Sequence, residues 1–476
     1  MTNRVHFIGI GGTGISAIAK VLVEKGWQVS GSDRSASSYT DEMGALGVKV
    51  FFNHAAANIG EIDFVVRSSA IPDDNIEVIT ALEKGQSVLK RVDFLPQVIG
   101  DQSWIAVAGT HGKTTTTAMI ASILMDAGMD PSFIIGSVSK NLGTNAHAGK
   151  GDYFVIEADE YDSMFLGLHP TLAVITNIEH DHPDCYPTPE VYSKAFVNFL
   201  ANLKPRGIVV LGADNPGCMS LKDQISVNIP VQTFSAYSLL NRNPFIDQQN
   251  ADYLLIQKDD GSYSVSLQEA LHFKKEILSL KLGVPGIHNL QNGMAAAVAA
   301  LIAGVDPEVI SRSLAEFRGT GRRFEIMGEI NGITLVDDYA HHPTEIRATL
   351  QAARMAFPGR RLWTVWQPHT YSRTQTLLTD YIEAISQSDQ IVITEVFAAR
   401  EKSTGFSAAQ IAESVINIPV TFAPSLDFAS NYLEEHLQPG DVVLVLSAGD
   451  ATQINLTLLK SPILLAATAS QKALSV

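Results

Sequence analysis

The first hundred residues alternate between short apolar runs and longer amphipathic stretches. Residues 5–10, 28–32 and 64–68 form apolar runs typical of buried strands, whereas residues 15–25 have the spacing of an amphipathic helix. Short strands that alternate with helices predict a parallel, doubly wound sheet.

A second unit is predicted to begin near Trp104, where an apolar run ends in a glycine-rich turn followed by a helical pattern. Further buried strands are predicted at residues 152–158, 171–178 and 207–212. Three later segments alternate in polarity as antiparallel strands do, and they predict a β-rich flank at residues 253–257, 263–267 and 276–282. An alanine-rich helix is predicted at residues 289–303.

The third zone starts near Gly321 and returns to the pattern of the first. Strands are predicted at residues 333–336, 362–366, 390–395 and 442–446, with helices between them. We therefore predict an α/β fold of three domains. They are a Rossmann-like domain at residues 1–100, a central P-loop α/β domain with a β-rich flank at residues 101–320, and a second Rossmann-like domain at residues 321–476.

The composition narrows the possible functions. The chain has 476 residues, of which 46% are hydrophobic, as is typical of a globular enzyme with several domains. Its net charge is −16 and it contains no basic run, so we expect no nucleic-acid partner. Cys185 and Cys218 have neither a metal-ligand spacing nor the pattern of a disulfide framework. The apolar tail at residues 454–467 is too short and too interrupted for a membrane span. We expect a cytoplasmic protein without membrane insertion, and the oligomeric state stays open.

The first motif is a glycine-rich turn at the end of the first predicted strand. Gly9, Gly11 and Gly14 fit the G-x-G-x-x-G spacing, and Asp33 stands at the end of the next strand, where a carboxylate can accept from a ribose hydroxyl. The backbone amides of such a turn bind a diphosphate. The spacing alone does not separate NAD from a nucleotide sugar, and the glycines could also serve only the turn.

A second phosphate loop follows the strand predicted at residues 103–108. It departs from the common pattern, which has a glycine at the position of Val107. Lys113 stands at a helix start, where the helix dipole disfavours a cation, and a bound phosphate removes that conflict. The hydroxyl of Thr114 can bind Mg²⁺. We therefore predict a nucleotide site at this loop.

Carboxylates and histidines are concentrated at the ends of two predicted strands in the central unit. Glu157, Asp159, Glu160 and Asp162 would repel one another unless a cation or backbone donors compensate. Glu157 ends a strand and is predicted to bind Mg²⁺. The cluster at residues 176–182 could hold a second Mg²⁺, with zinc as the rival, and the lack of further His or Cys residues at a matching spacing favours magnesium.

Two polar segments of the third zone also follow predicted strands, at residues 337–343 and 367–373. Ligands of open α/β sheets bind at the carboxyl ends of strands, so both segments are predicted to meet at one site. Arg373 is a candidate partner for a carboxylate. Arg322 and Arg323 could stack on adenine or contact phosphate, or they could be surface residues of a hinge.

Taken together, these segments resemble the Mur ligases of peptidoglycan synthesis over nearly the whole chain. The resemblance is carried, in order, by residues 9–14, 109–117, 157–162, 177–184, 288–292, 319–325, 337–345 and 367–374. It implies a UDP-sugar domain, an ATP-binding domain and a domain that binds an amino acid. The implied reaction converts the carboxylate of UDP-N-acetylmuramate to an acyl phosphate with ATP, and the amine of L-alanine then displaces phosphate.

The resemblance also implies roles for single residues. The UDP-sugar site would comprise Gly9, Gly11, Gly12, Thr13, Gly14, Ser32, Asp33, Ser68 and Ser69. The ATP site would comprise Gly109, Thr110, His111, Gly112, Lys113, Thr114, Thr115, Asn289, Asn292, Arg323 and Asp338. Two Mg²⁺ ions would be held with the help of Thr114, Glu157 and His182, and L-alanine would be bound by Tyr339, His341, His369 and Arg373. The residues expected to act in catalysis are Lys113, Glu157, His182, His341 and Arg373.

Three alternatives stand beside this interpretation. A related ligase attaches recycled murein tripeptide to the same UDP-sugar, and residues 160–162 also resemble that enzyme. Thr370 also departs from the Mur ligase pattern, because many relatives carry a second basic residue at this position. A nicotinamide-dependent dehydrogenase would explain Asp33 but not Lys113 or Glu157. A non-catalytic nucleotide-binding module would leave the clustered carboxylates without a cation.

Overall fold

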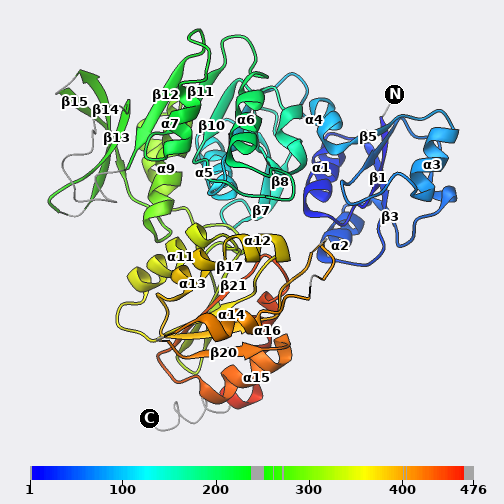
Figure 1. The fold of residues 1–476 in the computed structure, drawn as a ribbon. Helices are drawn as coiled ribbons and strands as arrows, with labels where there is room; N and C mark the ends of the chain where they lie inside the picture. Colours follow the sequence, from blue (N-terminus) through cyan, green and yellow to red (C-terminus); the bar gives the residue numbers. More distant parts are fainter. Residues whose placement is uncertain are drawn as a thin grey trace. The chain divides into compact units, whose positions relative to one another are not determined.

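The structure is a computed structural model that describes residues 3–236, 251–260, 262–270, 273–399, 401–403, 405–416 and 418–465. Figure 1 follows the chain from its N-terminus to its C-terminus. Contacts between Cα atoms divide it into two compact units. Unit 1 consists of residues 1–180, 185–283 and 290–318, and unit 2 of residues 181–184, 284–289 and 319–476.

The N-terminal part of unit 1 is a five-stranded parallel sheet with the order β3-β2-β1-β4-β5. Its strands are β1 (Arg4–Ile8), β2 (Gln28–Ser32), β3 (Lys49–Phe51), β4 (Phe64–Arg67) and β5 (Val88–Lys90). Its helices are α1 (Thr13–Glu24), α2 (Ser38–Ala45), η1 (Ala56–Asn58), α3 (Ile76–Glu83) and α4 (Arg91–Ile99). The order reverses direction beside β1, so the turns after β1 and β4 lie at the carboxyl edge where such sheets bind ligands.

The central part of unit 1 is a ten-stranded sheet with the order β15-β14-β13-β12-β11-β10-β6-β9-β7-β8. Its strands are β6 (Ser103–Ala108), β7 (Ser132–Ser139), β8 (Thr144–His147), β9 (Tyr153–Glu157), β10 (Leu172–Ile175), β11 (Ile208–Gly212), β12 (Val231–Ser235), β13 (Tyr253–Gln257), β14 (Tyr263–Ala270) and β15 (Phe273–Leu280). Its helices are α5 (Lys113–Asp126), η2 (Tyr161–Gly167), α6 (Pro189–Leu200), α7 (Pro216–Lys222), α9 (Ile287–Ile302, which continues from unit 2) and α10 (Pro307–Ala315).

The β-rich flank is part of this central sheet. β13 pairs in parallel with β12, whereas β14 and β15 add to it as antiparallel strands (Figure 1). At the other edge β8 pairs antiparallel with β7. The strands between these edges are parallel, and they carry long apolar runs because helices cover both of their faces.

Unit 2 contains a six-stranded sheet with the order β16-β17-β21-β18-β19-β20. Its strands are β16 (Glu325–Ile330), β17 (Ile333–Asp338), β18 (Leu362–Trp366), β19 (Gln390–Thr394), β20 (Val420–Ala423) and β21 (Val442–Leu446), of which only β16 is antiparallel to its neighbour. Its helices are α11 (Pro343–Ala356), α12 (Tyr371–Thr376), α13 (Leu378–Ile385), α14 (Ala409–Ser414), α15 (Leu426–His436) and α16 (Thr452–Leu458). Successive residues of β17 face opposite cores, with Leu335 in one and Val336 in the other.

The predicted fold class is confirmed, because each of the three sheets is mostly parallel and is combined with helices. The exact domain boundaries stay a prediction. None of the helices in the described parts of the chain is long and apolar enough to cross a membrane. Cys185 is half-buried and Cys218 is buried, and neither forms a disulfide in the described parts of the chain.

Candidate active site

The glycine-rich turn after β1 is held by hydrogen bonds to the end of β2. The amides of Gly9 and Ile10 donate to the carbonyl oxygen of Ser32 over 2.8 and 3.0 Å. The amide of Gly11 donates to Asp33 Oδ2 over 2.8 Å. The predicted residues Ser32 and Asp33 therefore fix the shape of the turn, which is a requirement for binding an anion through backbone amides.

A side chain would be crowded at two glycines of this turn. Gly9 has a φ of +86°, and a Cβ atom there would lie 3.0 Å from Ser68 Cβ. A Cβ atom on Gly11 would lie 2.8 Å from Asp33 Oδ2. Gly12 is the N-cap of α1 and no side chain caps this helix start, as expected where a phosphate binds the first amides.

The remaining predicted residues of the first site lie at the same edge of the N-terminal sheet. Thr13 is the first residue of α1, and the amide of Ser68 donates to the carbonyl oxygen of Ile8 over 2.9 Å at the end of β1. Ser68 is half-buried and Ser69 is exposed. The structure thus brings the turns after β1 and β4 together at one edge of the sheet.

Arg91 is a residue of this region that the sequence motifs did not reveal. It begins α4, and a Cβ atom on Gly14 would lie 1.8 Å from Arg91 Nη1, so the guanidinium lies against the start of α1. Arg91 Nη2 also lies 3.7 Å from Asp159 Oδ2. Burial lowers the pKa of Arg91, and nearby carboxylates oppose this shift. A cation at a helix N-terminus opposes the helix dipole, and an anion bound between them would relieve that conflict.

The second phosphate loop connects β6 to α5 and is held from one side by the residues after β10. The amide of Thr110 donates to the carbonyl oxygen of Asn177 over 3.0 Å, and the amide of His111 donates to Asn177 Oδ1 over 2.8 Å. A Cβ atom on Gly109 would lie 2.2 Å from Thr176 Oγ1. The cluster predicted at residues 176–182 therefore begins with residues that support the loop.

Gly112 gives the loop its last turn. Its φ of +83° is in the left-handed region, and a Cβ atom there would lie 2.2 Å from Asn292 Oδ1. The structure thereby places Asn292 directly against the loop, whereas its contact with ATP stays a prediction. Thr115 is buried in the first turn of α5.

Lys113 points back over the loop and forms a buried ion pair. Its Nζ donates to the carbonyl oxygens of Gly109 and Thr110 over 2.6 and 3.2 Å, and it lies 2.8 Å from Glu160 Oε2. Glu160 is fully buried and also accepts from the hydroxyl of Tyr192 over 3.1 Å. Burial lowers the pKa of Lys113, but Glu160 and the other carboxylates outweigh it and the pKa is raised. The ammonium therefore stays charged at neutral pH.

Thr114 and Glu157 form the oxygen cluster expected of a Mg²⁺ site. Thr114 Oγ1 lies 3.0 Å from each carboxylate oxygen of Glu157, and the amide of Gly136 donates to Glu157 Oε2 over 2.8 Å. A hydroxyl and a carboxylate are hard oxygen donors of the kind that Mg²⁺ prefers. The donor set of these two residues therefore fits the ion.

Arg373 is the centre of a buried charge cluster in unit 2. Its Nε donates to Asp181 Oδ1 over 2.9 Å. Its Nη1 lies 3.4 Å from His369 Nδ1, and its Nη2 lies 3.2 Å from His182 Nδ1. Burial alone would raise the pKa of Asp181, but Arg373 and neighbouring histidines hold it well below its usual range. The predicted residues His182, His369 and Arg373 are thus in contact.

His341 lies next to this cluster. Its ring centroid is 5.9 Å from that of His369, and its Nδ1 lies 3.0 Å from the carbonyl oxygen of Tyr339. Burial lowers the pKa of His341 to about 3, against the opposing effect of Glu345. The imidazole is therefore neutral at neutral pH.

Two guanidinium groups lie close to the ring of Tyr339. The Cζ atoms of Arg322 and Arg323 each lie 5.1 Å from its ring centroid. Arg323 Nη1 also lies 3.7 Å from Glu345 Oε1. Of the two arginines considered from the sequence, Arg322 bonds Asp337 over 3.2 Å, which gives it a structural role.

Asp338 is tied to the backbone by both of its carboxylate oxygens. The amides of Phe324 and Ala340 donate to them over 2.7 Å each. Burial raises the pKa of Asp338 to about 6. Asn289, in the part of α9 that belongs to unit 2, donates from Nδ2 to the carbonyl oxygen of Pro285 over 2.6 Å.

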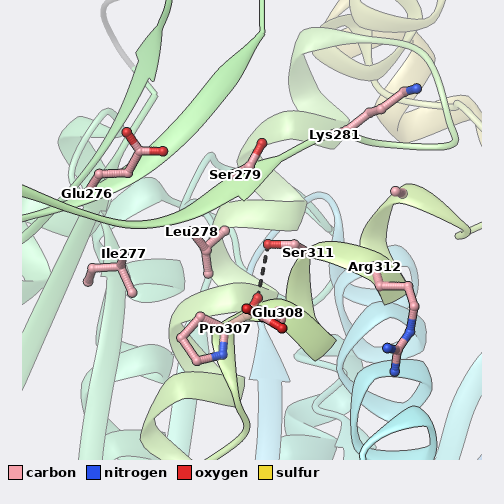
Figure 2. A pocket seen from close by; sticks show the side chains of 10 residues that line it. Glu276, Ile277, Leu278, Ser279, Lys281, Pro307, Glu308, Ser311 and Arg312 are labelled. Carbon is pink, nitrogen blue, oxygen red and sulfur yellow. Dashed lines mark hydrogen bonds between the residues drawn. The ribbon is translucent and has the colours of Figure 1, made fainter.

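A further hollow in unit 1 lies between β15 and α10 and contains none of the predicted site residues (Figure 2). Glu276 and Lys281 line it from the strand side, and Glu308 and Arg312 line it from the helix. The side chain of Ser311 donates to the carbonyl oxygen of Pro307 over 2.9 Å. Because acidic and basic groups are mixed, the hollow has no preference for an anionic ligand, and we assign it no part in the site.

Three residues with clear contacts in the site were given no role from the sequence. Glu160 belongs to the acidic run at residues 157–162, and Asp181 belongs to the cluster at residues 176–182, so the sequence contains a weak signal for both. Arg91 had none, because its contact with Gly14 depends on the packing of α4 against the start of α1.

Family models match the chain in three consecutive segments. They are described as the Mur ligase family catalytic domain at residues 4–102, the Mur ligase middle domain at residues 107–300 and the Mur ligase glutamate ligase domain at residues 322–449. A curated relative from Desulforamulus reducens, named UDP-N-acetylmuramate–L-alanine ligase, is 42% identical over 96% of this chain and 97% of its own.

Two solved structures extend the comparison. The UDP-N-acetylmuramate-alanine ligase of Thermotoga maritima is 28% identical, with a TM-score of 0.78 over 96% of this chain and 98% of its own. A murein peptide ligase of Psychrobacter arcticus is 27% identical, with a TM-score of 0.70 over 97% of this chain and 98% of its own. With the family models and a relative of this similarity along nearly its whole length, the chain belongs to the Mur ligase family.

Proposed function

We propose that this protein is an ATP-dependent ligase that joins L-alanine to the carboxylate of UDP-N-acetylmuramate in the synthesis of peptidoglycan precursors. The observation that carries this proposal is the presence of two glycine-rich anion loops in unit 1. One follows β1, and the other leads into α5 with Lys113 and Thr114, where Thr114 contacts Glu157 of β9. The relatives named for this reaction support the same substrates.

The reaction needs an activated carboxylate, because a free carboxylate is a poor acyl donor. An oxygen of the muramoyl carboxylate attacks the γ-phosphorus of ATP, and ADP leaves. The amine of L-alanine then attacks the carbonyl carbon of the acyl phosphate, loses a proton, and phosphate departs from the tetrahedral intermediate. The protein contributes mainly by positioning the reactants and neutralising charge.

In unit 1, Lys113 binds the β- and γ-phosphates of ATP. The γ-phosphate competes with Glu160 for the ammonium group, which the carbonyl oxygens of Gly109 and Thr110 hold in place. The loop amides from His111 to Thr115 bind phosphate oxygens, and Asn292 braces the loop from behind Gly112. Mg²⁺, held by Thr114 and Glu157, would neutralise charge on the phosphates.

In the N-terminal part of unit 1, the turn at residues 9–14 binds the diphosphate of the nucleotide sugar. Asp33, Ser68 and Ser69 line the same edge, whereas Ser32 supports the turn with its carbonyl oxygen. Arg91, against the start of α1, adds a positive charge for the anionic substrate.

In unit 2, the cluster around Arg373 binds the amino acid. Arg373 contacts the carboxylate of L-alanine, and the imidazoles of His341 and His369 stand near its amine. Tyr339 completes this site. The resemblance to Mur ligases is the support for assigning a second Mg²⁺ to His182, and for assigning adenosine contacts to Asn289, Arg323 and Asp338.

Ligation of recycled murein tripeptide is the second candidate, because the similarity to the murein peptide ligase of Psychrobacter arcticus extends over 97% of this chain. It would need more room beside Arg373 than L-alanine does. The dehydrogenase alternative is wrong, because the chain belongs to the Mur ligase family throughout its length. We further propose cytoplasmic action and domain boundaries near residues 100 and 320.

The test is to incubate the protein with UDP-N-acetylmuramate, ATP and Mg²⁺ and to follow the release of phosphate as single acceptors are added. Release with L-alanine, together with formation of the amide product, is the expected result. Release only with the tripeptide would replace the first candidate by the second. No release with any acceptor would refute both.

A further inference from the structure

A buried carboxylate lies behind the glycine-rich turn of the N-terminal sheet. Glu77, in the first turn of α3, is fully buried, and so is His6 in β1. Neither residue belongs to a motif that contacts a ligand. A buried carboxylate is unfavourable unless its oxygen atoms accept hydrogen bonds, so its partners indicate what it stabilises.

Both oxygens of Glu77 accept from more than one donor. Oε2 accepts from Ser32 Oγ over 2.5 Å and lies 3.1 Å from His54 Nδ1. Oε1 accepts from Asn58 Nδ2 over 2.6 Å and from the amide of Ala55 over 3.4 Å. The carboxylate therefore joins α3 to the end of β2 and to the segment around η1.

The charge on Glu77 is stabilised by these contacts and by His6. His6 Nε2 lies 3.8 Å from Glu77 Oε1. Burial alone would raise the pKa of Glu77, but the neighbouring His6 and the hydrogen bonds from Ser32 and Asn58 outweigh it and lower the pKa to about 2. The carboxylate is therefore ionised at neutral pH.

Ser32 connects this carboxylate to the substrate turn. Its hydroxyl donates to Glu77, while its carbonyl oxygen accepts from the amides of Gly9 and Ile10 over 2.8 and 3.0 Å. The next residue, Asp33, accepts from the amide of Gly11 over 2.8 Å. One residue thus contacts the buried carboxylate with its side chain and the turn with its main chain.

We propose that Glu77 is a positioning residue for the nucleotide sugar, which holds Ser32 and thereby the backbone of Gly9 and Ile10 in the conformation that binds the diphosphate. Glu77 is fully buried, so it acts through Ser32 and does not touch the substrate. This inference rests on the proposed binding of UDP-N-acetylmuramate at this turn.

Glu77→Gln is the informative substitution because it keeps the size and shape of the side chain. The amide has only one oxygen, so its NH₂ group must face either Asn58 and Ala55 or Ser32 and His54. Facing Asn58 and Ala55, the NH₂ group meets two donors. Facing Ser32 and His54, it donates to Ser32 Oγ, so the Ser32 hydroxyl no longer donates to position 77. In both orientations the hydroxyl loses its charged acceptor. Ser32→Ala removes only the hydroxyl and leaves the carboxylate with its other partners.

The measurement is the dissociation constant of UDP-N-acetylmuramate by titration calorimetry without ATP, together with steady-state kinetics. For Glu77→Gln we expect a rise in this constant and in KM for UDP-N-acetylmuramate on the order of tenfold, since a hydrogen bond to a charged group is lost. The kcat at saturating substrate and the KM for ATP should be unchanged. Ser32→Ala should raise the same two constants. The double variant should raise the dissociation constant by less than the product of the two single fold-changes, because both substitutions break the same hydrogen bond.

Glu83→Gln, at an exposed position of the same helix, is the matched control and should bind like the wild type. A fall in kcat and in the folded fraction with unchanged KM would mean that Glu77 only stabilises the fold, which would overturn the inference. Equal binding by wild type and both variants would also overturn it. If the wild type itself fails to bind UDP-N-acetylmuramate, the proposed function fails instead, and the two failures are thereby distinguished.

Discussion

Removing the charge of Lys113 should destabilise the central sheet as well as abolish catalysis. In the structure Lys113 Nζ lies 2.8 Å from Glu160 Oε2, with the side chains 13% and 0% exposed. Lys113→Met leaves the carboxylate of Glu160 buried without its cation, with the hydroxyl of Tyr192 still donating to it. Breaking one partner of a buried pair costs about 3–5 kcal/mol, and the partial exposure of Lys113 places our expectation near about 3 kcal/mol.

A second substitution separates this electrostatic cost from lost packing. Glu160→Gln, added to Lys113→Met, removes the stranded charge and keeps an oxygen that can accept from Tyr192. The double variant should therefore recover most of the lost stability, with a coupling free energy of about 2 kcal/mol or more between the two positions. Neither variant should release phosphate from ATP, because both lack the ammonium group that binds the γ-phosphate.

The assay is urea unfolding at neutral pH, with phosphate release measured on the same samples. The pKa of Lys113 is raised above its usual 10.5, so the stability that the pair contributes is complete at neutral pH and is lost only as the pH rises above that range. Lys150→Met, at an exposed lysine, is the control and should unfold like the wild type. If Lys113→Met unfolds at the wild-type urea concentration, or if Glu160→Gln restores nothing, the reasoning about a coupled buried pair is wrong.

Three further predictions concern the other parts of the site. Gly11→Ala brings a Cβ atom to 2.8 Å from Asp33 Oδ2, so KM for UDP-N-acetylmuramate should rise on the order of tenfold while KM for ATP stays unchanged, as initial rates can measure. Arg373→Lys replaces a guanidinium that bonds Asp181 over 2.9 Å, and we expect a rise in KM for L-alanine on the order of tenfold or more, since a single ammonium group cannot reproduce the fork geometry. The pKa of His341 is lowered to about 3, so as the pH falls below about 6.5 this histidine is protonated in the unfolded chain but not in the folded one, and the folded state loses stability. His341→Asn should therefore reduce the loss of unfolding free energy between pH 7 and pH 5 by up to about 2 kcal/mol, as urea unfolding can measure.

Controls and contrary outcomes differ for these three experiments. Gly44→Ala introduces a Cβ atom with no neighbour within 4 Å, and it should leave the kinetics of the first substrate unchanged. A normal KM for UDP-N-acetylmuramate in Gly11→Ala would show that the turn does not bind it. If Arg373→Lys changes only KM for ATP, Arg373 is not at the amino-acid site. Identical acid sensitivity of wild type and His341→Asn would mean that His341 titrates normally.

Much of the fold follows from the pattern of apolar residues. The predicted strands at residues 28–32, 253–257, 362–366 and 442–446 coincide with β2, β13, β18 and β21. These strands carry either a continuous apolar run or a clear alternation, because neighbouring layers bury one or both faces.

The sequence pattern does not predict several short strands and one edge strand of unit 2. β3 and β5 have three residues each, too few for a period to be recognised. β16 is an edge strand with half-exposed side chains, so its sequence has no apolar run. These segments are strands because they pair with a neighbouring strand, and the pattern of a single sequence does not show which segments pair.

The candidate site likewise contains residues that the sequence reveals and residues that only the folded structure reveals. The glycine-rich turns and the oxygen donors Thr114 and Glu157 could be recognised from the sequence, because each is signalled by residues close together in the chain. That they bind phosphate and Mg²⁺ stays a prediction. The pair of Asp181 and Arg373 joins residues 192 positions apart, and only the folded chain reveals it. The role of Glu77 behind the first turn was hidden for the same reason.

The central claim is that the muramoyl carboxylate passes through an acyl phosphate before L-alanine attacks. Its most direct test uses UDP-N-acetylmuramate with both carboxylate oxygens labelled with ¹⁸O, and mass spectrometry of the phosphate released in the presence of ATP, Mg²⁺ and L-alanine. One labelled oxygen should move into each phosphate while the other stays in the new amide. Phosphate without label, released at the same rate with or without L-alanine, would contradict the account, because ATP would then be hydrolysed by water.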